Sequence, residues 1–139
     1  MSQDLFIACR RDDAELVKKL LAGHPNKTTW SGMAPLHRCA QENSCKAAKV
    51  LMDAGANVNS KSAWGWYTPL HLACRSGHEK VAVQLLYAGA KLLVRDKAGR
   101  TPLELGREQG YDMECNRIET KARHVMALRR AKEAKDQPS

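Results

Sequence analysis

Two short stretches of the chain place a histidine close to a cysteine, the pairing that a cysteine nucleophile or a zinc ion would use. His37 lies two positions before Cys39, and His71 lies three positions before Cys74. A structural zinc site needs four ligands, which usually come in pairs such as Cys-x2-Cys. The sequence contains no such cysteine pair and no glycine-rich phosphate-binding motif. We therefore expect no catalytic residues, no metal and no cofactor.

The same two histidines lie near the start of short helices that recur along the chain. In Thr68-Pro69-Leu70-His71 the threonine is a good N-cap, and proline suits the first helical position. Glycines at 77 and 89 are expected to end this helix and the one that follows it. The opening motif occurs 34 positions earlier as Ala34-Pro35-Leu36-His37 and 33 positions later as Thr101-Pro102-Leu103-Glu104.

This period and motif resemble the ankyrin repeat. The resemblance implies an all-α fold: a solenoid of stacked helix-turn-helix units with projecting hairpin-like fingers. It also implies that His37 and His71 are structural, since their rings bond the capping region and neighbouring backbone. The expected domain spans 3–122, and a basic extension of the last helix with a disordered tail spans 123–139. The expected repeats are 3–33, 34–67, 68–100 and 101–122.

Composition limits the setting in which the protein works. The length of 139 residues fits a single domain. The net charge of +8 favours an acidic partner. Its five cysteines are an odd number, and four of them fall on inward positions of the repeat, where they read as small buried hydrophobes. We expect no secretion signal, no transmembrane segment, a cytoplasmic or nuclear location, and a monomer.

Three departures from the repeat pattern carry structural predictions. Ala34 replaces the capping threonine, so the helix it precedes should be less stable by about 1 kcal/mol. The link over 57–67 is one residue longer than the ankyrin spacing, which predicts a bulged fingertip. Residues from Asp112 to about Lys135 carry no stop signal and are predicted to form one long helix that overruns the stack.

The resemblance also implies a concave binding face, made of the fingertips and the exposed side of each first helix. All three tryptophans fall on fingertips, although the repeat core needs none of them, and arginines lie around them. Tryptophan, tyrosine and arginine dominate interface energetics. The expected partner-binding residues are Arg10, Arg11, Trp30, Met33, Arg38, Glu42, Trp64, Trp66, Tyr67, Arg75 and Arg100.

We therefore expect a non-catalytic adaptor that binds an acidic or phosphorylated segment of another protein. One alternative is a methyl-lysine reader, in which Trp30, Trp64, Trp66 and Tyr67 form an aromatic cage, with Glu42 as a nearby acid. A second alternative is contact with nucleic acid or an anionic membrane through the basic helix at 117–135. That helix also carries acids, so we do not expect nucleic acid to be the partner. A structural role for single tryptophans, folded back across their own fingers, also stays open.

Overall fold

The computed structural model describes residues 2–21 and 32–136, and Trp30 lies outside this range. The described residues form helices and loops without a strand. The helices are α1 (Ser2–Arg10), α2 (Ala14–Leu21), α3 (Pro35–Glu42), α4 (Cys45–Asp53), α5 (Pro69–Arg75), α6 (Glu79–Tyr87), α7 (Pro102–Glu108) and α8 (Asp112–Asp136).

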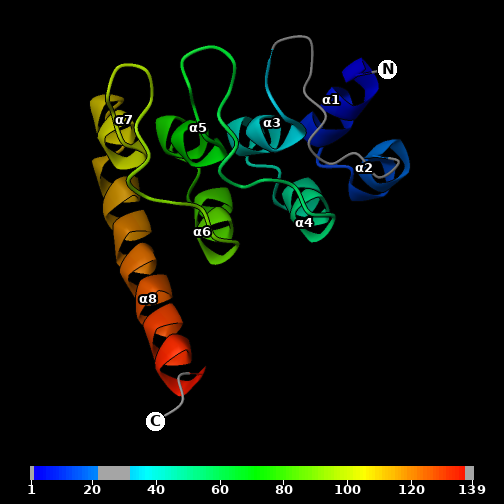
Figure 1. Ribbon diagram of the computed structural model, residues 1–139. Coiled ribbons are helices and arrows are strands. Elements are labelled where there is room, and N and C mark those ends of the chain that lie inside the picture. Colours follow the sequence, from blue (N-terminus) through cyan, green and yellow to red (C-terminus); the bar gives the residue numbers. More distant parts are fainter. Residues whose placement is uncertain (1, 22–31, 137–139) are drawn as a thin grey trace.

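The helices stand in two rows (Figure 1). In one row α1, α3, α5 and α7 pack in sequence, and in the other α2, α4, α6 and α8 do the same. The loops that lead into α5 and α7 project from the first row, on the side away from the second. This arrangement confirms the expected all-α stack of helix-turn-helix units with projecting fingers.

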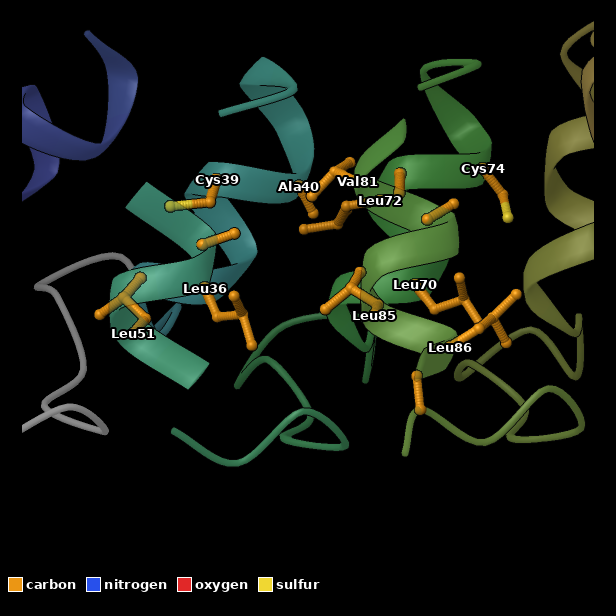
Figure 2. Close-up of a cluster of buried hydrophobic side chains, with 14 of the residues drawn as sticks. Leu36, Cys39, Ala40, Leu51, Leu70, Leu72, Cys74, Val81, Leu85 and Leu86 are labelled. Carbon is orange, nitrogen blue, oxygen red and sulfur yellow. The ribbon is translucent and has the colours of Figure 1, made fainter. Parts of the chain in front are cut away.

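The core lies between the two rows. Leu36 and Leu70 of the first row and Leu51 and Leu85 of the second are fully buried and belong to one cluster of buried side chains (Figure 2). Four cysteines, at positions 9, 39, 74 and 115, are also buried, and all five in the chain are free thiols. The four are thus small buried hydrophobic residues, as the sequence predicted.

Each of the two repeat histidines bridges its own helix cap to the next finger. His37 Nδ1 accepts a hydrogen bond from the Ala34 amide at 3.1 Å, so Nε2 carries the hydrogen and donates to the Tyr67 carbonyl at 2.7 Å. His71 makes the same pair of bonds, to the Thr68 amide at 3.2 Å and to the Arg100 carbonyl at 2.9 Å. The structural role expected for both histidines is therefore confirmed.

The caps of the first-row helices differ as the sequence predicted. Thr68 Oγ1 accepts from the His71 amide at 3.3 Å, and Thr101 Oγ1 accepts from the Glu104 amide at the same distance. Ala34 has nearly the same backbone angles as Thr68 but makes no side-chain cap bond. The His37 amide therefore has no side-chain acceptor and donates instead to the Ala34 carbonyl at 3.0 Å.

The last helix continues far past the stack, as predicted. α8 buries Cys115, Ile118 and Val125, and Arg129 Nη2 donates to the Leu86 carbonyl at the end of α6, at 2.8 Å. Contact with the stack thus extends beyond residue 122, where the domain was expected to end. Residues 130–135 are exposed, and Figure 1 shows this end of α8 projecting past α6. None of the described helices is both long and apolar enough to cross a membrane.

The absence of a side-chain cap at Ala34 can be tested by substitution. Ala34→Thr should raise the free energy of unfolding by about 1 kcal/mol, because its hydroxyl can accept from the His37 amide, which otherwise bonds only to the Ala34 carbonyl. Thr68→Ala is the matched control and should lower it by a similar amount. Urea unfolding followed by circular dichroism measures both, and no gain for Ala34→Thr would contradict the cap assignment.

The buried histidines make stability depend on pH. Burial lowers the pKa of His37 and of His71 from the ordinary value of 6.5, although the hydrogen bonds to backbone carbonyls oppose this. The unfolded chain therefore binds more protons below about pH 6.5, so stability present above that pH is lost as the pH falls. Urea midpoints should drop between about pH 7.5 and about pH 5.5. The double variant His37→Gln/His71→Gln, which keeps a donor and an acceptor at each site, should lose less over this range; an equal loss would assign the effect to other groups.

Candidate binding face

The finger that leads into α5 is built around a buried serine. The Ser62 amide donates to the Tyr67 carbonyl at 2.8 Å, and the Ser62 hydroxyl accepts from the Tyr67 amide at 3.0 Å. In the next finger the Asp96 amide donates to the Arg100 carbonyl at 2.9 Å, so that turn is one residue shorter. The extra residue thus bulges the tip of the first of these fingers without breaking the stack, as predicted.

The bulge places two tryptophans in solvent. Trp64 is 78% exposed and Trp66 is 48% exposed. Trp66 also has a φ of 57°, in the left-handed region that a bulky side chain rarely adopts. Such a conformation usually costs about 1–3 kcal/mol. The finger therefore keeps the Trp66 indole at the surface, although the left-handed backbone at this position is unfavourable for a bulky residue.

Neighbouring fingers are joined through their backbones. The Ala63 amide donates to the Gly32 carbonyl at 3.0 Å, and the Lys97 amide donates to the Gly65 carbonyl at 2.9 Å. Both bonds lie at the fingertips, beyond the histidine bridges at their bases. We call the surface made of residues 32–33, 60–67 and 94–100, with the exposed sides of α1, α3, α5 and α7, the finger face. Hydrogen bonds between the fingers hold the backbone of this surface in place.

Arg100, a predicted partner-binding residue, is engaged within the protein. Its Nε donates to Asp96 at 3.0 Å, its Nη1 to Glu108 at 2.9 Å and its Nη2 to the Tyr67 hydroxyl at 3.4 Å. Burial favours the neutral form of Asp96, but the backbone and side-chain bonds from Arg100 outweigh it and lower the pKa of Asp96. Arg100 thus joins two fingers and α7, with its charge compensated by two carboxylates.

Arg38 is also partly compensated. Its guanidinium carbon lies 3.6 Å from the centroid of the Phe6 ring, and its Nη1 is 3.5 Å from Glu42. The same nitrogen donates to Gln41 at 3.2 Å. Glu42, predicted to contact a partner, is therefore the counter-ion of Arg38.

The remaining predicted residues differ in how much they are engaged. Arg75 lies over the Tyr67 ring, with its guanidinium carbon 5.2 Å from the centroid, and Lys61 Nζ lies 5.7 Å from the centroid of Trp66. Arg10 and Arg11 are exposed, and Met33 is half-buried. Within residues 2–21 and 32–136, no carboxylate pairs with Lys61, Arg75, Arg10 or Arg11. On the finger face, uncompensated positive charge therefore lies at the end of α1 and near the start and end of α5, among other positions.

The basic helix has more internal partners than its sequence suggested. Arg117 Nε donates to Glu79 of α6 at 2.6 Å, and Glu119 pairs with both Arg107 and Arg123. Lys121, Arg130, Lys132 and Lys135 make no ion pair in the described part of the chain. Among the described residues, no three His, Cys, Asp or Glu side chains gather where they could hold a metal ion.

Comparison with family models agrees with this geometry. The model described as "Ankyrin repeats (3 copies)" matches residues 4–62, and the model "Ankyrin repeat" matches residues 66–97. Together they cover more than half of the chain. The chain belongs to the ankyrin-repeat family. No curated protein matches it. The α7–α8 pair supplies a fourth repeat beyond the matched residues. Ankyrin repeats generally serve as non-catalytic modules for protein–protein interaction.

Sequence reasoning missed the internal roles of three charged residues on this face. Asp96 starts an Asp-x-x-Gly turn, in which its Oδ1 accepts from the amides of Ala98 and Arg100 at 3.0 and 2.9 Å. This turn pattern could have been recognised, because aspartate often accepts from the backbone two residues on. Glu108 lacked such a signal, because its pairing with Arg100 depends on how the finger packs on α7, and the contact of Lys61 with Trp66 depends on the bulged conformation of their own finger.

The left-handed backbone at Trp66 can be tested by comparing two replacements. Trp66→Gly should be more stable than Trp66→Ala by about 1 kcal/mol, because alanine keeps the Cβ that disfavours a positive φ. Both variants lose the same indole contacts, so the difference isolates the backbone. Equal stability in urea unfolding, or a more stable alanine variant, would show that the left-handed conformation is not required there.

Proposed function

We propose that this ankyrin-repeat protein is a non-catalytic adaptor that binds an acidic or phosphorylated segment of another protein across the finger face. The observation that carries the proposal is the exposed Trp66, held in a left-handed conformation on a finger whose base is fixed by His37. Strain of this kind persists where the surrounding structure over-determines it, and it clusters at functional sites.

The composition of the face supports this proposal. Trp64 and Trp66 offer large apolar surfaces of the type that anchors protein interfaces. The uncompensated arginines beside them favour an anionic partner. Because the fingers are joined to one another through backbone bonds, binding requires little ordering of the backbone.

The charges on the aromatic rings bear on the methyl-lysine alternative. Lys61 lies over Trp66 and Arg75 lies over Tyr67, so these rings already carry cations of the protein itself. Glu42, the acid that a cationic ligand would need, is paired with Arg38. These contacts favour an anionic ligand over a cationic one.

Capture from a cell lysate tests the proposal. Proteins held by the wild type should be lost from Trp66→Gly, which removes the indole and retains the backbone conformation. Tyr87→Ala is the matched control, because Tyr87 is 53% exposed but lies on α6, in the other helix row. Capture of the same proteins by all three, with equal folding by circular dichroism, would contradict a binding role for Trp66.

A further inference from the structure

We infer that the group recognised on the finger face is a phosphate, carried by the partner segment and held by Lys61 and Arg75. This inference rests on the proposed function and narrows it from an acidic or phosphorylated segment to a phosphorylated one.

The two cations belong to one small patch. Lys61 lies over Trp66 and Arg75 lies over Tyr67, and these aromatic residues are consecutive in the chain. The rings of Tyr67 and His71 are in edge contact, with centroids 6.1 Å apart, and His71 lies one helical turn before Arg75 on α5. The aromatic residues that the two cations contact therefore lie where the finger meets α5.

The patch carries positive charge that the protein does not neutralise. Arg38 has Glu42, and Arg100 has both Asp96 and Glu108. In the part of the chain that the structure describes, Lys61 and Arg75 have no carboxylate partner, and each lies over an aromatic ring. A cation over a ring leaves its N–H groups available to a ligand, since the ring accepts no more than a weak contact from them.

Two uncompensated cations match a phosphate better than a carboxylate. A phosphorylated side chain carries about −1.5 to −2 charges at neutral pH and three acceptor oxygens, whereas a carboxylate carries a single charge. The planar guanidinium of Arg75 can donate two parallel bonds to phosphate oxygens, and the Lys61 ammonium adds a point charge. The exposed indole of Trp66 beside them offers apolar surface to the residue next to the phosphate.

Arg100 has a positioning role in this arrangement. It donates to the Tyr67 hydroxyl at 3.4 Å and is itself held by Asp96, so it fixes the ring over which Arg75 lies. The ligand contacts are assigned to Lys61 and Arg75, and Arg100 acts through Tyr67.

Labelled peptide pools with one fixed central residue test the inference. The pools carry phosphoserine, phosphothreonine, phosphotyrosine, glutamate or serine in random flanking sequence, and fluorescence anisotropy measures their dissociation constants. At least one phosphorylated pool should bind about tenfold more tightly than the glutamate pool. Arg75→Gln and Lys61→Gln should each weaken that binding about tenfold, while Lys80→Gln, which removes an exposed cation from α6 in the other helix row, should leave it unchanged.

A pH series separates phosphate from carboxylate. Binding of the phosphorylated pool should weaken between about pH 7.5 and about pH 5.5, because the second pKa of phosphate is about 6. Binding of the glutamate pool should change little over this range, since that carboxyl is ionised throughout. Circular dichroism at each pH keeps loss of fold apart from loss of binding.

The outcomes distinguish this inference from the proposed function. No gain from phosphorylation in any pool, or equal binding by Arg75→Gln and wild type, would overturn the phosphate inference. If lysate proteins still depend on Trp66 in that case, the adaptor function stands with another type of ligand. If capture from lysate is unaffected by Trp66→Gly, the proposed function fails as well.

Discussion

The bond from a repeat histidine to the carbonyl at the base of the next finger is the interaction on which the finger face depends. Each ring accepts from its own helix cap, so its tautomer is fixed and its second nitrogen must donate outward. One side chain thereby sets the start of a helix and the position of the following finger. Because both bonds are buried or partly buried, losing one would leave a polar group unsatisfied.

The fingers owe their surface chemistry to this fixed base. The base ends at Tyr67 in one finger and at Arg100 in the next, so an additional residue must be accommodated at the tip. The chain accommodates it with a left-handed Trp66, whose indole is partly exposed. The additional residue in this finger thus leads to an exposed aromatic side chain. Lys61 lies over that side chain, and Arg75 lies over the ring of the next residue.

Features set by local sequence could be predicted, whereas those set by contacts across the stack could not. The helix caps at Thr68 and Thr101, the missing cap at Ala34 and the length of α8 follow from residue type and spacing. The arginines show the limit: all lay on the expected face, but only the folded stack determines that Arg100 meets two carboxylates while Arg75 meets none. The sequence placed Trp30 on the same face, and it lies outside the described residues.

The histidine bridges run in one direction, from the start of a first-row helix to the end of the finger that leads into the next first-row helix. His37 is completed by residue 67 and His71 by residue 100, and in the fourth repeat Glu104, which accepts from the Thr101 amide, takes the place of a histidine. During synthesis on a ribosome, the N–H of each ring would therefore lack its carbonyl acceptor until the next finger had been synthesised. Each histidine bridge would therefore form only after about 30 further residues had been synthesised. Glu104 differs, because the bond that it accepts comes from Thr101, which precedes it in the chain.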